Sequence, residues 1–224
     1  GDKVKTGSPL FFDKLKPEVK WASPSNGVVT SIHFGDRRII EKIEIAVEDK
    51  KPESYKSFSS SELNAADRET VMKNILDACI FPLIRQRPFN KVADPNDVPR
   101  DIFISAYNTA PLSVNVSKVI QNSKDQFQAG LTALSKLTEG SVYLTSQNPM
   151  EFDNATNVTI EGPHPAGNVG IQIHHIKPIN PGEVIWTVNA QHVITIGKLF
   201  QNGHYDPGCI VSIGGSGSSN PQTV

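Results

Sequence analysis

The sequence predicts a short all-β unit followed by a larger α/β domain, and three observations support this fold class. Residues 1–48 read as short strands joined by glycine and proline turns. Residues 49–66 are polar and rich in serine, which is typical of a linker. From residue 67 to residue 224, segments of helical and strand-like periodicity alternate, which predicts a largely parallel sheet.

The composition excludes several classes of protein. The chain has 224 residues, 38% of them hydrophobic, which allows one large or two small domains. A formal net charge of −1 argues against a general nucleic-acid-binding protein. Cys79 and Cys209 are too far apart to form a metal or redox spacing. No signal peptide and no apolar run of the ~18–20 residues needed for a membrane span is present, so we expect no membrane span.

The β unit is predicted from its alternating pattern. Ile39, Ile43, Ile45 and Val47 alternate with polar residues, as in a half-buried strand. The pair Asn26-Gly27 indicates a tight turn, because both residues tolerate a positive φ angle.

The α/β domain begins with a predicted helix over residues 69–81, which Asn64 or Ser61 would cap. A strand is expected over residues 101–107. A second amphipathic helix is expected over residues 116–138, where four apolar residues share one face and Glu139-Gly140 ends the helix. The four residues are Phe127, Leu131, Leu134 and Leu137.

The remaining elements complete the predicted alternation. Residues 141–146 and 157–163 read as strands, residues 189–203 as a helix, and residues 209–215 as a closing strand. Both ends of the chain open or stop directly on strand-like sequence, so we expect the chain to be part of a longer protein.

The stretch from Ile80 to Val92 is the first candidate site. Two arginines, a lysine, two prolines and two phenylalanines fall within thirteen residues. The cationic side chains supply hydrogen-bond donors, Phe81 and Phe89 supply flat apolar surface, and the prolines restrict the backbone. The candidate binding residues are Ile84, Arg85, Gln86, Arg87, Pro88, Phe89, Asn90 and Lys91. The same residues would also suit a solvated basic turn with both phenylalanines in the core.

The second candidate is the stretch from Glu161 to Ile176, in which prolines and glycines surround His164. Glycines allow a ligand to approach the backbone, although a tight connection between strand and helix would look the same. The adjacent pair His174-His175 lacks the spacing of a metal site. No nucleophile motif is present, and Gly214-Gly215-Ser216-Gly217 does not fit a dinucleotide turn.

The β unit resembles the lipoyl/biotinyl-like barrel-sandwich fold. The matching residues are Gly1-Asp2-x-Val4-x-x-Gly7-x-x-Leu10 and Ser23-Pro24-x-x-Gly27-Val28-Val29-x-x-Ile32. In carrier domains of that fold a lysine at a hairpin tip holds the cofactor. This chain has Pro17 in that register, with Lys16 before it, so we expect a structural and partial unit rather than a carrier.

Taken together, these stretches resemble the NqrA family, which supplies one subunit of the Na⁺-translocating NADH:quinone oxidoreductases. The resemblance follows the family's order over nearly all of the chain, and its most specific motifs are RQRPFNK and GPHPAG. The matching segments are GDKVKTGSPLFFDK, ASPSNGVVTSIH, IRQRPFNKV, GPHPAG, QIHHI, VNAQHVITIGKLF and VSIGG. The resemblance implies that the family's C-terminal domains are absent from this chain.

The α/β domain is also similar to the flavin-carrying, NADH-binding subunit of complex I and to the C subunit of the Rnf complex, which implies a Rossmann-like fold. In the complex I relative a glycine-rich arginine loop lies along FMN. Here PLIRQRPFNK keeps the arginines and loses the glycines, and residues 106–112 lack the acidic residues that would face NADH. The comparison therefore implies that the FMN and NADH sites are lost.

The resemblance implies a cofactor-free peripheral subunit of a sodium-transporting oxidoreductase complex. It would contribute to binding of ubiquinone or another quinone and to assembly with the other subunits, on the cytoplasmic side of the bacterial inner membrane. The isolated chain is not expected to be catalytic. Two alternatives are an FMN- and NADH-binding electron-transfer subunit and a lipoyl- or biotinyl-type carrier module.

Overall fold

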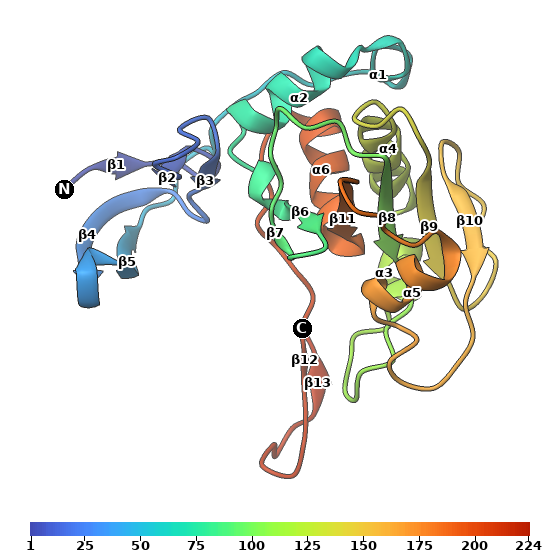
Figure 1. Ribbon diagram of the computed structural model, residues 1–224. Helices are drawn as coiled ribbons and strands as arrows, with labels where there is room; N and C mark the ends of the chain where they lie inside the picture. The colour runs from blue at the N-terminus through green and yellow to red at the C-terminus, as the bar shows by residue number, and fades with distance from the viewer.

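The computed structural model describes residues 1–224 and shows a small β unit beside an α/β domain (Figure 1). The β unit has a three-stranded sheet in the order β1-β4-β5 and a two-stranded sheet of β2 and β3, with all pairs antiparallel. Its strands are β1 (Lys3–Val4), β2 (Pro9–Phe12), β3 (Lys20–Ala22), β4 (Gly27–Phe34) and β5 (Ile40–Val47). The predicted all-β unit is therefore confirmed.

The segment predicted as a linker contains a helix. Helix α1 (Ser60–Ala65) begins after Ser59, whose side chain accepts a hydrogen bond from Glu62 N–H in a capping box. Helix α2 (Arg68–Asp77) begins after Asp67, whose carboxylate accepts from Thr70 N–H at 2.8 Å. The predicted caps Ser61 and Asn64 are wrong, because both residues lie inside α1.

The α/β domain is built on one six-stranded sheet in the order β10-β9-β8-β11-β6-β7. The first four strands in that order are mutually parallel, and β6 and β7 are antiparallel to their neighbours. The strands are β6 (Ile84–Arg87), β7 (Lys91–Val92), β8 (Asp101–Ser105), β9 (Val142–Ser146), β10 (Thr156–Thr159) and β11 (Ile185–Asn189). The largely parallel sheet is confirmed, whereas residues 84–91, expected as a loop, form a hairpin.

The chain changes direction across this sheet at β8. After β8, the next two strands, β9 and β10, are added on one side, and β11 is added on the other side. The connections therefore diverge between β8 and β11. In open sheets with parallel strands, ligands bind outside the carboxyl ends of the strands at such a point.

Helix and strand alternate through the domain, with two differences from the prediction: strand β11 was not predicted, and one predicted helix is broken. The helix expected over residues 116–138 is divided at Ser123 and ends at Ser135, well before Glu139-Gly140. The helices are α3 (Val116–Asn122), α4 (Lys124–Ser135), α5 (Val169–Ile176) and α6 (Ala190–Asn202). None of the helices in the structure combines the length and the apolar character needed to cross a bilayer.

The last predicted strand, over residues 209–215, is much shorter in the structure. Strand β12 (Ser212–Ile213) pairs with β13 (Gln222–Thr223) in a hairpin that extends away from the body of the domain (Figure 1).

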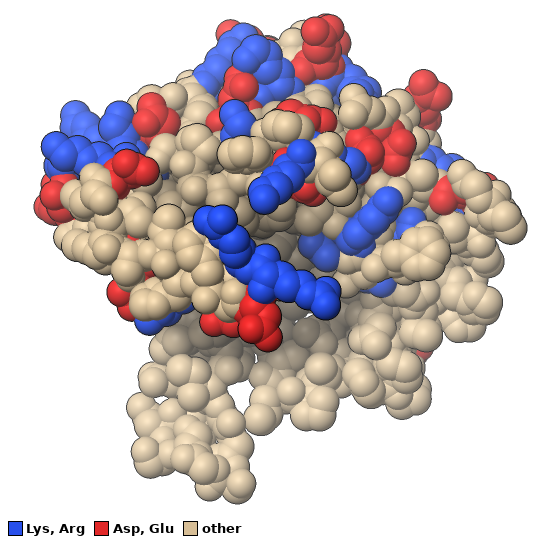
Figure 2. Space-filling model, turned by 60° about the vertical axis from the view of Figure 1, so that its left-hand side comes forward, with Lys and Arg blue, Asp and Glu red and all other residues tan.

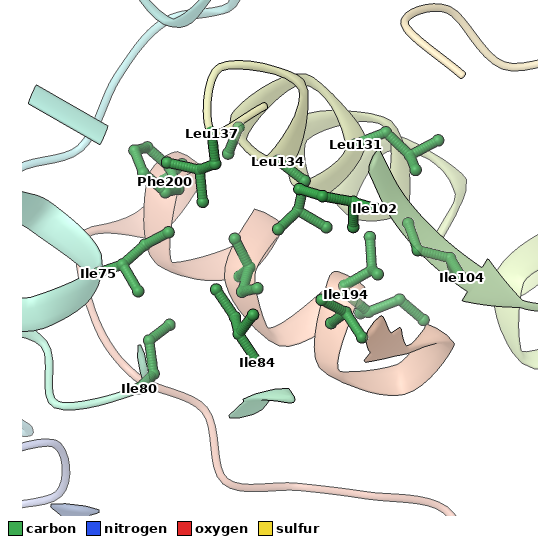
Figure 3. Close-up of a cluster of buried hydrophobic side chains, with 14 of the residues drawn as sticks. Ile75, Ile80, Ile84, Ile102, Ile104, Leu131, Leu134, Leu137, Ile194 and Phe200 are labelled. Carbon is green, nitrogen blue, oxygen red and sulfur yellow. The ribbon is translucent and has the colours of Figure 1, made fainter. Parts of the chain in front are cut away.

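The two faces of the six-stranded sheet are covered unequally. On one face, Ile102 and Ile104 of β8 pack in the main core with residues of α2, α3, α4 and α6 (Figure 3). On the other face, Phe103 packs with Ile173 of α5 and with Ile185 in a core cluster of 3 buried residues. A single helix of eight residues thus covers the second face, and part of that face stays open.

Two glycines allow α4 and α6 to approach closely. A methyl group added at Gly130 would lie 2.1 Å from the Val193 carbonyl oxygen, and one added at Gly197 would lie 1.7 Å from the Gln126 carbonyl oxygen. Both distances are far below van der Waals contact, so only glycine permits this packing.

A buried carboxylate fixes the opposite, amino-terminal edge of β8. Asp101 is fully buried and accepts hydrogen bonds from Arg100 Nε at 2.7 Å and from Ser141 N–H at 3.1 Å, and it pairs with Lys177 Nζ at 2.8 Å. Burial raises the pKa of Asp101, but the hydrogen bonds from Lys177, Ser141 and Arg100 outweigh burial and lower that pKa below its ordinary value. Arg100 also pairs with Glu183, which links β8 to the segment before β11.

The β unit is anchored to the α/β domain by packing and polar contacts. Val19 is buried in the main core, and the Tyr55 hydroxyl donates to the Gly7 carbonyl at 2.9 Å. Lys16, the lysine nearest the carrier register, pairs with Asp94 of the α/β domain at 2.5 Å. This pairing gives Lys16 a structural contact.

We expect Gly130→Ala to lower the free energy of unfolding by about 1–3 kcal/mol, because the added methyl group overpacks the contact between α4 and α6. This sign is opposite to the gain of roughly 1 kcal/mol that alanine brings to a helix. Urea unfolding followed by circular dichroism measures the change. Gly170→Ala in α5 is the matched control, because a methyl group there meets only Arg87 Nη1, at 4.0 Å. Equal effects of the two substitutions would contradict the packing argument.

We expect Asp101→Asn to cost about 3–5 kcal/mol of stability at neutral pH, because it leaves buried cationic partners without their counter-charge. A carboxyl group with a lowered pKa stabilises the fold above its unfolded pKa of about 3.9, and that contribution is lost as the pH falls through the folded pKa. The difference between wild type and variant should therefore shrink below about pH 4. The exposed Asp36→Asn is the control, and a difference that stays constant with pH would refute the ion-pair explanation.

Candidate functional site

A cleft of about 730 Å³ lies where the strand connections diverge. Its walls come from the carboxyl ends of β8 and β11, from strand β6, and from the first turns of α5 and α6. The volume lies within the roughly 300–1,000 Å³ typical of small-molecule sites. The cleft opens on the face of the sheet that α5 leaves partly uncovered.

The two arginines of the first candidate stretch both line this cleft. Along β6 the side chains alternate, so Arg85 and Arg87 face the same side as their β11 partners Thr187 and Ile185. The intervening Gln86 points to the other face, where its Oε1 accepts from Asp94 N–H at 3.2 Å. Ile84 is fully buried in the main core.

Neither arginine pairs with a carboxylate. Arg85 Nη2 donates to the Asn90 carbonyl across the hairpin turn, and Arg87 Nε is buried without a hydrogen-bond partner. Burial, and to a lesser extent the charge of Arg85, lower the pKa of Arg87. Most of the donors on these two side chains are free to meet a ligand.

The other members of the predicted segment lie at or beyond the edge of the cleft. Asn90 lines it, whereas Pro88, Phe89 and Lys91 are exposed on the hairpin and lie outside it. Phe89 is 85% exposed. Phe81 is buried against Trp186 with ring centroids 5.8 Å apart, so the expectation that it presents a flat surface to a partner is wrong.

The second candidate stretch reaches the same cleft through its glycines. We call residues 162–168 the His164 loop. His164 itself is exposed, and its Nδ1 lies 3.1 Å from Thr109 Oγ1, which in turn accepts from Gly167 N–H at 3.0 Å. The Tyr107 hydroxyl donates to the Gly162 carbonyl at 3.2 Å. His164 therefore contacts the segment after β8, and residues 167–171 of this stretch line the cleft.

A buried glutamine that sequence reasoning did not single out holds the His164 loop in place. Gln172 Nε2 donates to Ser105 Oγ at 3.0 Å and to the Ala166 carbonyl at 3.1 Å. Its Oε1 accepts from Thr145 Oγ1 at 2.6 Å. The network connects the carboxyl ends of β8 and β9 to the loop. In the sequence, the only indication of this role is that Gln172 is a polar residue within an apolar segment.

His192 is another lining residue that sequence reasoning missed. It lies in the first turn of α6, directly after the helix cap Asn189. Burial lowers the pKa of His192, although a hydrogen bond with the Leu83 backbone opposes that shift. At neutral pH its ring is therefore neutral and can both donate and accept a hydrogen bond.

The walls of the cleft combine cationic and apolar side chains and contain no Asp or Glu. The apolar residues are Pro82, Leu83, Val116, Val169, Ile171 and Val188. The bordering segments 102–117 and 162–176 also contain no Asp, Glu, Lys or Arg. Figure 2 shows mixed charges over the upper part of the molecule, whereas the lower part, where the C-terminal hairpin protrudes, is almost free of them.

Other sequence candidates do not form a site. No group of three or more His, Cys, Asp or Glu side chains is arranged to hold a metal ion. Cys79 is buried and Cys209 is exposed, and both thiols are free. Burial raises the pKa of Cys79 to about 11, so this thiol is not activated as a nucleophile.

The fold and the cleft define an α/β protein with a small-molecule cleft at the carboxyl ends of parallel strands, joined to a barrel-sandwich unit. Comparison with known proteins identifies its family. A family model described as the NqrA second alpha/beta domain matches residues 66–205, and one described as the NqrA N-terminal barrel-sandwich hybrid domain matches residues 1–48. The chain belongs to the NqrA family.

Curated relatives agree with the family match. The chain is 36% identical to the NqrA subunit of the Na(+)-translocating NADH-quinone reductase of Saccharophagus degradans over 229 residues, and 36% identical to that of Marinomonas sp. over 227 residues. The corresponding protein of Pasteurella multocida is also 36% identical. These alignments cover 100% of the chain and 51% of each relative, so the chain spans about half the length of these proteins.

We expect Gln172→Leu to lower stability by about 1–3 kcal/mol, because Thr145 and Ser105 lose a buried partner. Amide hydrogen exchange should become faster in the His164 loop, at its non-proline residues within 162–168. Gln201→Leu is the matched control, because the Gln201 side chain makes one exposed hydrogen bond, to the Asp125 carbonyl at 3.1 Å. Unchanged exchange in the loop would show that Gln172 does not hold it.

Proposed function

We propose that this chain is part of a Na⁺-translocating NADH-quinone reductase and contacts the quinone at the cleft. The family membership supports the first part of the proposal, since the relatives carry that name. The observation that carries the second part is the pair Arg85 and Arg87, whose free donors enter a cleft with apolar walls.

The chemistry of a quinone matches these walls. A quinone offers two carbonyl acceptors on a flat apolar ring, and each guanidinium presents several N–H donors in a fixed plane. Leu83, Val169 and Ile171 supply apolar surface for the ring. Hydrogen bonds to a charged donor contribute more than neutral ones, so the arginines would dominate the orientation of the ring.

We further propose that the chain holds no flavin or nicotinamide cofactor. Under the resemblance, the cleft would correspond to the place where the complex I relative carries its glycine-rich loop, and Arg85, Arg87 and Leu83 line it here. The segment after β8, from Ala106 to Leu112, has no acidic residue for NADH. The divergence of the strand connections at β8 favours a fold shared with that flavin-carrying subunit. Saturable FMN binding to the purified chain would contradict the cofactor-free proposal.

In the complex, the chain would be a peripheral subunit on the cytoplasmic side of the membrane, held there by the other subunits. The exposed and nearly uncharged part of the molecule around the C-terminal hairpin supports contact with partner proteins (Figure 2). The β unit would have a structural role, because Lys16 is paired with Asp94 rather than free at a hairpin tip.

We expect Arg87→Gln to weaken binding of a soluble quinone analogue roughly tenfold or more, because it removes charged donors from the cleft. Isothermal titration of the purified chain measures the affinity. Phe89→Ala is the control, because Phe89 is exposed on the hairpin tip outside the cleft. Loss of affinity in Phe89→Ala but not in Arg87→Gln would move the quinone to the hairpin tip and contradict the proposed site.

A further inference from the structure

The cleft carries positive charge that no neighbouring carboxylate balances. Arg85 and Arg87 lie two residues apart on one face of β6, and neither forms an ion pair. No lining residue of the cleft is acidic. A partly buried cation without a counter-charge is costly, so the site is poised to accept negative charge from outside the chain.

Arg87 differs from two other partly buried arginines of the α/β domain in how many of its side-chain donors are bonded. Arg100 donates to Asp101, to Glu183 and to two backbone carbonyls, and Arg68 donates to the Pro95 and Asp97 carbonyls. Arg87 has no such partner, and its buried Nε is unsatisfied. Arg68 Nε is also buried without a partner, but Arg68 is held through its Nη2, so Arg87 is the one of the three arginines whose guanidinium makes no hydrogen bond within the chain.

The backbone around the cleft adds to the positive electrostatic potential of the two arginines. Arg87 approaches the first turn of α5, since a methyl group at Gly170 would lie 4.0 Å from Arg87 Nη1. The first turn of a helix carries partial positive charge, so a cation placed there is unfavourable unless an anion lies between them. The segments 102–117 and 162–176 bring no acidic side chain to offset it.

We propose that the group bound between Arg85 and Arg87 is an oxyanion on an apolar or aromatic body, which is a carboxylate or a phosphoryl group. This proposal rests on the cleft being a ligand site and goes beyond the proposed function, because it assigns the cleft a second, anionic class of ligand that would compete with the neutral quinone. A guanidinium fork matches the planar oxygens of such a group, and two forks on one strand face can hold it from one side. The apolar wall of Leu83, Val169 and Ile171 fits the body of the ligand.

The test compares ligands of similar shape and different charge. Benzoate, phenyl phosphate and neutral benzamide are titrated into the purified chain, and amide chemical shifts of Gly167 and Gly170 report occupation of the cleft. We expect at least one charged probe to bind tenfold or more tightly than benzamide. The tighter of benzoate and phenyl phosphate identifies whether a carboxylate or a phosphoryl group is preferred. Equal affinity for benzamide, or no binding of any probe, overturns the proposal.

Variants establish which side chains create the preference. Arg87→Gln and Arg85→Gln should each reduce the preference for the charged probe at least severalfold. Arg38→Gln is the matched control, because it removes the same charge from an exposed turn between β4 and β5. A preference that survives in both cleft variants overturns the proposal.

A parallel titration with a neutral quinone separates this inference from the proposed function. Quinone binding without any preference for the charged probes overturns the oxyanion site and leaves the quinone proposal in place. A preference for the charged probes without quinone binding supports the oxyanion site and contradicts the quinone proposal.

Discussion

The close contact between α4 and α6 is the interaction on which the architecture of the domain depends. Gly130 and Gly197 allow the two helices to meet backbone to backbone, so both fit on one face of the sheet together with α3. The other face is left to α5, which covers Phe103 and Ile185 but not the strand β6. The cleft is the consequence, because it occupies the uncovered part of that face.

The cleft keeps its shape because polar groups fix its loops to the sheet. The His164 loop contains two hydrogen-bonded turns, from Ala166 N–H to the Pro163 carbonyl and from Asn168 N–H to the Pro165 carbonyl, but these do not attach it to the sheet. Gln172 supplies that path from within α5 by reaching Ser105, Thr145 and the loop carbonyl of Ala166. A buried network whose hydrogen bonds are all made specifies one arrangement of the loop. Any other arrangement would leave buried polar groups without hydrogen-bond partners.

The sequence predicted the larger features because they depend on periodicity. Strands β8, β9 and β10, helix α6 and the β unit follow from alternation and helical spacing, whereas strand β11 is not predicted. The motifs RQRPFNK and GPHPAG, both conspicuous in the sequence, contribute residues to one cleft. Local features were harder to predict. The hairpin of β6 and β7 is too short for a periodic signal, and the helix breaks at Ser123 without a glycine or proline to indicate it. Phe81 is buried and Phe89 is exposed. The sequence places both in the same basic stretch and does not indicate which of them is buried. Gln172 and His192 lie in apolar runs, and only their partners in space reveal their roles.

The net charge of the chain does not indicate the local charge of the cleft. A net charge of −1 is a sum over the whole chain and does not show which charges are paired, as Arg100, Asp101 and Lys177 are. The two arginines of β6 have no acidic partner because of their position. Their strand faces loops without acidic residues and the first turn of α5, which also carries partial positive charge. Their unbalanced charge is a local property of the fold. It arises because the strand connections diverge at β8 and bring uncharged segments, rather than carboxylates, to the open face of the sheet.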